Sequence, residues 1–270
     1  MREISVTRHL PRWLAGAALA ALINPLALAT PTAQEIVERA NQASYYAGRD
    51  GRSEARMRIE DSRGQTQTRQ FTVLRRNVDQ QRQQYLVVFS RPSEYRDTAF
   101  LVEKNPAAED DRWLYLPAMD LVRRIAPGDK RTSFVGAHLF YEDISGRHLD
   151  DDTHELIDTT EQHYLIRSRP KDPRSVEFAF FTTWIDREHH LPLRVEYTNA
   201  AGEVYRRMES SGIEVIDGYP TPTVMRVQDL ASGGHTIVQF RGISYDLDLP
   251  ANVFTERSLR HPPSQWLERR

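Results

Sequence analysis

The feature that most constrains this chain is a long succession of short segments with strand-like alternation, separated by turn residues. In residues 55–60, apolar and charged side chains alternate strictly, which is typical of a strand with one buried and one wet face. The turn residues 61–64 follow, and a second strand through Phe71 and Val73 returns, which predicts a hairpin. No helical segment of crossover length separates the strands, so the pattern favours antiparallel pairing over a parallel α/β sheet.

Further strands are expected along the rest of the chain. Residues 85–89 form one that stops at Arg91-Pro92, and residues 121–125 pair with 112–116 across the turn at 117–120. The remaining predicted strands span or pass through 99–102, Glu155, Tyr164, Val176, Leu193, Val204, Val224 and Ile237. Their spacing of roughly 10 to 15 residues predicts a mainly β (α+β) domain. Its core would be an antiparallel meander in a single curved sheet or an open barrel.

Residues 176–184 form the most apolar of these predicted strands. Alternation places four large side chains of this segment on one face: Val176, Phe178, Phe180 and Trp184. Apolar side chains also fall on the opposite face, so both faces are expected to be partly covered. A sheet whose concave side packs against helices or a ligand would need such a strand.

A helix is expected before the first strand. Thr32 and Glu35 have the spacing of a capping box, in which each side chain satisfies a free backbone N–H at the helix start. Ile36, Ala40 and Ala43 then recur on one helical face. The chain therefore opens its folded part with one amphipathic helix.

The segment 133–150 breaks the strand pattern. It holds glycines near both ends and an apolar cluster without period-two alternation. We interpret it as a loop with a short helix that lies over the concave face of the sheet as a movable lid. The predicted lid residues are Phe134, Leu139, Phe140 and Tyr141.

Residues 1–29 have the pattern of an export signal. Three arginines in the first twelve residues precede the apolar run 14–23, and Ala27-Leu28-Ala29 provides small residues for cleavage before Thr30. A membrane anchor is the alternative, but the run is shorter than the about 20 apolar residues that a spanning helix needs. The prediction is a signal peptide at 1–29 and one domain at 30–270, located in the periplasm. No cysteine stands at the cleavage site, so the protein is not expected to be a lipoprotein.

Charge and cysteine content exclude several functions. The chain has 36 basic and 38 acidic residues, of which the leader holds three arginines and one glutamate, so 33 and 37 remain and the net charge is −4. This mild charge gives no indication of nucleic acid as a partner. The chain has no cysteine, which excludes thiol catalysis and thiolate metal ligands. No cofactor is expected.

Four histidines fall close together in the sequence near the acidic residues 150–152, and they are His138, His148, His154 and His163. Their spacing is not that of an H-E-x-x-H zinc motif, and no G-x-S-x-G nucleophile motif is present. We therefore predict no metal site and no catalytic residue. A hydrolase on a β scaffold that uses this cluster remains an alternative.

Arginine supplies 33 of the 36 basic residues, and many arginines alternate with apolar residues. Examples are Arg56, Arg58, Arg194, Arg206 and Arg226. We interpret them as a solvated convex face with cross-strand ion pairs. The alternative is a rim that meets lipid phosphates or a partner protein.

Residues 111–125 (DRWLYLPAMDLVRRI), 133–136 (SFVG) and 140–144 (FYEDI) together resemble the outer membrane lipoprotein-sorting protein family, relatives of the periplasmic carrier LolA. Residues 254–260 (FTERSLR) resemble the end of that family's domain. The resemblance implies a half-open barrel closed by helices around an apolar cavity. It also implies carriage of acyl chains between an inner-membrane exporter of the resistance-nodulation-division type and the outer membrane, without catalysis.

The sequence thus predicts a monomeric carrier of lipid or lipidated protein. A soluble protein moves a lipid only by hiding its acyl chains, and each buried CH₂ contributes about 0.8 kcal/mol. The residues predicted to bind lipid are Met57, Ile59, Phe71, Val73, Phe89, Phe178, Phe180 and Trp184. For each of them the alternative is core packing against a helix. A lipid-sensing or regulatory module that acts on a membrane partner is the other alternative function.

Overall fold

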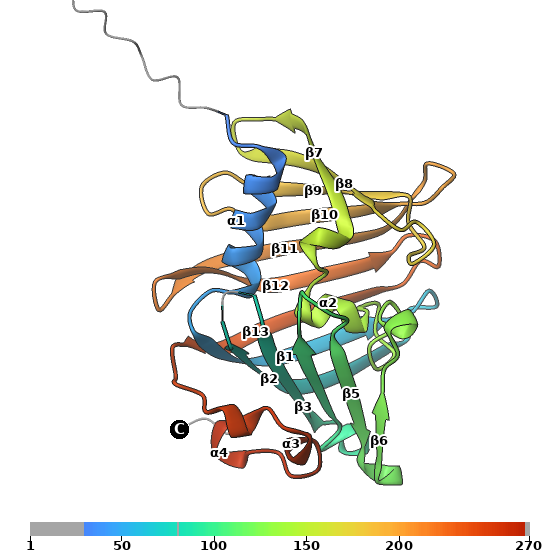
Figure 1. Ribbon diagram of the computed structural model, residues 1–270. Helices are drawn as coiled ribbons and strands as arrows, with labels where there is room; N and C mark the ends of the chain where they lie inside the picture. The colour runs from blue at the N-terminus through green and yellow to red at the C-terminus, as the bar shows by residue number, and fades with distance from the viewer. Residues whose placement is uncertain (1–29, 80, 268–270) are drawn as a thin grey trace, which may run out of the picture. The chain divides into compact units, whose positions relative to one another are not determined.

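A single curved, unclosed sheet of thirteen antiparallel strands dominates the described part of the chain (Figure 1). The structure is a computed structural model that describes residues 30–79 and 81–267. The predicted signal peptide at 1–29 lies outside the described residues. Within the described ranges no helix is long and apolar enough to cross a bilayer.

The strands are β1 (Asp50–Glu60), β2 (Thr66–Asn77), β3 (Gln83–Arg91), β4 (Ala99–Lys104), β5 (Asp111–Leu116), β6 (Leu121–Arg124), β7 (Asp152–Thr159), β8 (His163–Pro170), β9 (Phe180–Asp186), β10 (Pro192–Thr198), β11 (Val204–Ile216), β12 (Tyr219–Asp229) and β13 (His235–Tyr245). The α-helices are α1 (Ala33–Tyr45), α2 (Tyr141–Ser145), α3 (Glu256–Arg260) and α4 (Ser264–Leu267). Short 3-10 turns are η1 (Ser93–Tyr95), η2 (Pro117–Met119), η3 (Pro127–Asp129), η4 (Leu149–Asp151) and η5 (Ala251–Val253).

The strand order joins two sequential meanders. Strands β1 to β6 are neighbours in sequence order, as are β7 to β13, and the first strand pairs with the last, β1 with β13. Consecutive strands β6 and β7 therefore lie at opposite edges of the sheet. The connection between them, residues 125–151, is called the strap below. Because it starts at one edge and ends at the other, it has to cross the sheet.

The predicted architecture is confirmed: the protein is mainly β, with one antiparallel sheet, an N-terminal helix and a short helix in the segment that crosses the sheet. The hairpin predicted around residues 61–64 pairs Ala55 with Phe71. The predicted pairing of 112–116 with 121–125 is confirmed between β5 and β6.

The strand predicted over 176–184 is partly wrong. Strand β9 begins at Phe180, since its partners end there: β8 pairs no further than Phe181 and β10 no further than Phe180. Residues 176–179 form a loop, so Phe178 does not share a strand face with Phe180 and Trp184.

The sheet half β1–β6 is covered on both faces. On the concave side, odd-numbered residues of β1–β3 and even-numbered residues of β4 pack with the strap: Met57, Ile59, Phe89, Phe100, Phe134, Leu139 and Tyr141. On the other side, residues of β2–β5 pack against the C-terminal segment: Leu74, Leu86, Leu101, Leu249, Phe254 and Leu259. Because both faces of the sheet are buried here, the sequence of β3 is a nearly continuous apolar run and does not alternate between apolar and polar residues.

The sheet half β7–β13 is covered differently. Helix α1 lies over its concave face, where Ile36, Val37 and Ala40 pack against Ile166 of β8 and Ile185 of β9 (Figure 1). The predicted capping box is present, with Thr32 Oγ1 accepting from Glu35 N at 3.2 Å and Thr32 N donating to Glu35 Oε2 at 2.8 Å. One 13-residue helix cannot fill the face of seven strands, and this leaves room for a cavity.

Candidate binding cavity

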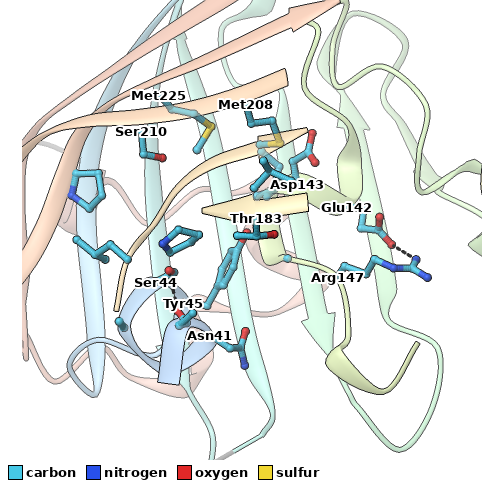
Figure 2. Close-up of a pocket in the computed structure, with 18 of the residues that line it drawn as sticks. Asn41, Ser44, Tyr45, Glu142, Asp143, Arg147, Thr183, Met208, Ser210 and Met225 are labelled. Carbon is cyan, nitrogen blue, oxygen red and sulfur yellow. Dashed lines mark hydrogen bonds and ion pairs between the residues drawn. The ribbon is translucent and has the colours of Figure 1, made fainter. Parts of the chain in front are cut away.

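A cavity of about 410 Å³ lies between α1, the strap and the concave face of the sheet. This volume falls in the range of about 300–1,000 Å³ that is usual for small-ligand pockets. Figure 2 shows Asn41, Ser44 and Tyr45 of α1 on one side of it and Met208, Ser210 and Met225 of the sheet on the other. The cavity is thus bounded by segments from both ends and the middle of the chain.

Apolar side chains make up most of the cavity wall. They come from strands on both sides of the β1–β13 junction, from α1 and from the strap: Val37, Ala40, Phe71, Val73, Leu139, Ile144, Phe181, Ile185, Val195, Met208, Met225, Val238, Phe240 and Ile243. Methionine side chains such as Met208 and Met225 are flexible and adapt to irregular contents. Such a wall suits hydrocarbon of variable shape better than one rigid polar ligand.

Buried ion pairs fix the strap beside this cavity. Glu142 is 3% exposed and accepts from Arg131 at 2.7 Å and from Arg147 at 3.4 Å. Arg147 also holds Asp152 with two hydrogen bonds of 2.8 and 3.1 Å. Burial alone would raise the pKa of Glu142, but Arg131 and Arg147 outweigh it and hold that pKa below its usual value. Figure 2 shows the pair of Glu142 and Arg147 at the cavity.

A second buried pair joins the strap to the far half of the sheet. Arg206 of β11 is 3% exposed and donates to Asp143 at 2.5 Å and to the carbonyl of His138 at 3.2 Å. Its guanidinium also stacks 4.3 Å from the ring centre of Phe140. The prediction that Arg206 lies on a solvated convex face is therefore wrong. It shares the inner face with Met208 and Ser210, because alternate residues of a strand face the same side.

Lys104 caps the short helix of the strap. Its ammonium is buried and donates to the carbonyls of Ser145 at 2.7 Å and Gly146 at 3.1 Å, which are the free acceptors at the end of α2. Burial lowers the pKa of Lys104 to about 8, and the nearby Asp110 only partly offsets this.

The strap touches α1 at Gly146. A Cβ atom built there would lie 2.6 Å from Cζ of Tyr45, and the backbone has φ of +75°, which favours glycine. Burial raises the pKa of the Tyr45 hydroxyl. Glycine at this position lets the Tyr45 ring lie against the strap backbone at the cavity wall.

The structure separates the eight predicted lipid-binding residues into three groups. Phe71 and Val73 line the cavity. Met57, Ile59 and Phe89 lie on the same concave face, but the strap covers them, and they belong to the solid core. The sequence identified the concave face of β1–β3 and could not show which part of it the strap fills.

The other three residues do not line the cavity. Phe178 is buried in the loop before β9, with its ring centre 4.9 Å from the guanidinium carbon of Arg131. Phe180 and Trp184 alternate with the cavity residues Phe181, Thr183 and Ile185, so they face the outer side of the sheet. There Phe180 contacts Arg167 and Arg169, and Trp184 contacts Arg194. Both faces of β9 are apolar, and its sequence therefore did not reveal the inner one.

The predicted lid residues pack against the core and against arginine side chains. Phe134, Leu139 and Tyr141 are buried in the core of the β1–β6 half, where the Phe134 ring packs at an angle against the rings of Phe89 and Phe100. The Phe140 ring contacts the guanidinium groups of Arg131 and Arg206, whose central carbons lie 5.1 and 4.3 Å from the ring centre. Only Leu139 of the four lines the cavity.

Three of the four histidines that lie close together in the sequence bond different partners. His138 bonds Thr236 at 2.9 Å, and His148 bonds Asp110 at 2.8 Å. His154 lies between the Ser168 hydroxyl at 2.8 Å and the Leu149 carbonyl at 3.1 Å, and burial lowers its pKa. Within residues 30–79 and 81–267, no three His, Asp or Glu side chains are grouped so as to hold a metal ion.

Comparison with known proteins places this chain in a family. A family model with the description "Uncharacterized protein" matches residues 81–261, which is more than half of the chain. The chain belongs to that family. A search of curated proteins finds no match.

Solved structures show the same fold. The chain is 28% identical to a DUF1329 family protein from Desulfovibrio piger, with a TM-score of 0.77 over 85% of this chain and 100% of that one. It is 24% identical to an outer membrane lipoprotein-sorting protein domain from Vibrio parahaemolyticus, with a TM-score of 0.73 over 84% and 96% of the two chains. It is 19% identical to a LolA superfamily protein from Nitrosomonas europaea, with a TM-score of 0.66 over 84% and 99%. The resemblance inferred from the sequence is confirmed at the level of the fold.

Replacement of Gly146 tests the contact between strap and helix. Gly146→Ala should lower the free energy of unfolding by more than the about 1–3 kcal/mol of backbone strain alone, because Gly146 has φ of +75° and ψ of 152° and the new methyl group also overlaps Tyr45. Gly64→Ala is a control for a side chain at positive φ without the overlap, since Gly64 has φ of +77° and a methyl group added there would meet no other side chain or distant backbone within 4 Å. Urea denaturation measures both. Equal losses in the two variants would contradict the contact.

Lys104 predicts a pH dependence of stability. Between about pH 8 and the ordinary lysine value of 10.5, the unfolded chain keeps a proton that the folded protein has lost. Folding is then favoured by rising pH, with a slope of at most about 1.4 kcal/mol per pH unit. The free energy of unfolding of the wild type should therefore rise in this window relative to Lys104→Met, which shares every other titrating group. Identical pH slopes for the two proteins would show that Lys104 is not buried as described.

Proposed function

We propose that the protein is a non-enzymatic carrier that shelters the acyl chains of a lipid or lipidated protein in the cavity under α1 and the strap. The observation that carries this proposal is the cavity itself, a hollow of about 410 Å³ with a mostly apolar wall beside a well-packed core. A hollow forfeits the packing contacts that a filled core has. Occupation by hydrocarbon restores those contacts.

The energetics fit one acyl chain. Burial of about ten CH₂ groups at about 0.8 kcal/mol each contributes about 8 kcal/mol, from which the ordering of chain and protein is subtracted. The result is binding that is firm in water and reversible at a membrane, which a carrier needs. Met208 and Met225 on the wall support release, since flexible side chains adapt to a cavity that empties and fills.

The leader pattern and the fold support a setting for this carrier. With residues 1–29 acting as a cleaved signal peptide, the carrier works as a soluble monomer in the periplasm. It receives its cargo from an inner-membrane exporter of the resistance-nodulation-division type and passes it toward the outer membrane. The likeness in fold to a lipoprotein-sorting domain and to a LolA superfamily protein supports this setting.

Filling the cavity tests the proposal. Ser210 lines the cavity, whereas its neighbour Ser211 is exposed and lies outside the wall. Ser210→Phe should weaken the binding of a fluorescent fatty acid to delipidated protein at least tenfold, because the ring occupies space that the chain needs. Ser211→Phe adds the same ring on the other side of the strand and should leave the affinity unchanged. Titrations followed by fluorescence measure both, and equal affinities in the two variants would refute the cavity as the binding site.

One observation favours the hydrolase alternative. The Ser168 hydroxyl, the His154 ring and the Leu149 carbonyl form a chain of hydrogen bonds, and Ser168 and His154 both line the cavity. A serine, a base and a group that orients the base are the elements of a nucleophilic site. On the carrier proposal this is a cross-strand contact between β7 and β8, where the two residues are directly paired.

Hydrolysis assays decide between the two functions. We expect no turnover of a p-nitrophenyl fatty acyl ester by the wild type, and we expect Ser168→Ala and His154→Ala to bind fluorescent fatty acid within about threefold of the wild type. Ester hydrolysis by the wild type that Ser168→Ala abolishes would establish the enzyme and overturn the carrier.

A further inference from the structure

Some charged side chains on the cavity wall have an oppositely charged partner within the described part of the chain, and others do not. Glu142, Asp143 and Asp152 line the cavity, and each is held by an arginine: Glu142 by Arg131 and Arg147, Asp143 by Arg206, Asp152 by Arg147. The acids on the wall are therefore neutralised without a ligand.

Arg75 of β2 lines the same cavity and lacks such a balance. Its guanidinium donates to the Asn77 side-chain oxygen at 2.7 Å and to the backbone carbonyl of Ala47, and both acceptors are uncharged. Within the described ranges, no carboxylate forms an ion pair with it. A cation beside a mostly apolar hollow, without a counter-ion, attracts anions more strongly than the same group in water.

The contacts of Arg75 leave donors unused. A guanidinium has five N–H groups, and the two acceptors near Arg75 occupy only part of them. The remaining N–H groups of Arg75 are not needed by the backbone carbonyls at the end of α1 and just after it. Gln83 Nε2 donates to the Tyr45 carbonyl at 2.6 Å, and Asn77 Nδ2 donates to the Gly48 carbonyl at 2.8 Å. Arg75 is half-buried and lines the cavity, so a ligand there can reach its guanidinium.

A second polar group approaches from across the sheet. Gly51 of β1 pairs with Arg75 on one side and with Tyr245 of β13 on the other. Because Gly51 has no side chain, the Tyr245 ring lies over it, with Cε1 3.5 Å from the position that a Cβ atom would take. The Tyr245 hydroxyl bonds Thr221 Oγ1 at 2.9 Å, and both residues line the cavity. One end of the cavity, next to the C-terminus of α1, is therefore polar and cationic.

We propose that the cargo is an anionic single-chain amphiphile whose carboxylate or phosphate head is bound by Arg75, with its hydrocarbon tail along the apolar wall formed by Met208, Met225 and Val238. This inference rests on the proposed function and specifies its ligand class. The planar fork of arginine matches two oxygens of a carboxylate or phosphate. The Tyr245 hydroxyl borders the same end of the cavity and adds a polar neighbour to the head.

Matched ligands test the head group. Isothermal titration calorimetry with palmitate, hexadecanol and palmitoyl lysophosphatidate compares a carboxylate, a neutral hydroxyl and a phosphate on tails of the same length. The wild type should bind at least one of the two anions at least tenfold more tightly than hexadecanol. The anion that is bound more tightly identifies the head as carboxylate or phosphate.

Variants of two adjacent arginines test whether Arg75 causes the preference for the anion. Arg75→Met should remove the preference, so that the variant binds the preferred anion and hexadecanol within about threefold of each other. Arg76→Met is the control and should keep the preference, since Arg76 lies outside the cavity and contacts Gln84 at 3.3 Å. Arg75→Gln is neutral but able to donate to the Ala47 carbonyl, and it should also lose the preference. It provides a second test in case Arg75→Met does not fold.

The outcomes separate the inference from the function on which it rests. Equal binding of palmitate, lysophosphatidate and hexadecanol by the wild type would overturn the role of Arg75 and leave the acyl carrier standing. A preference for the anion that survives in folded Arg75→Met and Arg75→Gln would also overturn it. Failure of the wild type to bind any of the three would overturn the carrier itself.

Discussion

The structure depends on one topological constraint: strands β6 and β7, consecutive in sequence, occupy opposite edges of the sheet. The strap between them must cross the concave face, and its large side chains fill that face over β1–β6. Helix α1 covers part of the β7–β13 half. The space that neither segment fills is the cavity. The cavity next to a solid core thus follows from the order of the strands, and from the fact that α1 and the strap together are too short to cover the whole concave face.

The strap is held at the cavity by charge. Over β1–β6 the strap packs on aromatic side chains such as Phe89 and Phe100. Beside the cavity it faces empty space and has fewer apolar side chains to pack against. There Arg131, Arg147 and Arg206 hold Glu142 and Asp143. Removal of one member of a buried pair costs about 3–5 kcal/mol. Buried pairs have strict geometry, so they fix the strap in one position while the wall beside them stays open.

Much of the fold could be predicted from the sequence, and less of the site. Period-two alternation and turn residues located the strands, because each depends on neighbours in sequence. Phe71 and Val73 were correctly placed on the inner face for the same reason. Phe180 and Trp184 were not, since both faces of β9 are apolar and only the pairing with β8 and β10 decides which one is inside. Arg206 and Asp143 lie 63 residues apart, and no local pattern shows that they meet.

The central claim is that hydrocarbon occupies the space between α1, the strap and the sheet. A crystal structure of the delipidated protein grown with a fatty acid brominated along its tail tests it most directly, because anomalous scattering locates bromine without interpretation of weak density. The account predicts bromine peaks inside the cavity, near Met208, Met225 and Val238. Bromine found only on the outer surface, with the cavity closed by its own side chains, would contradict it.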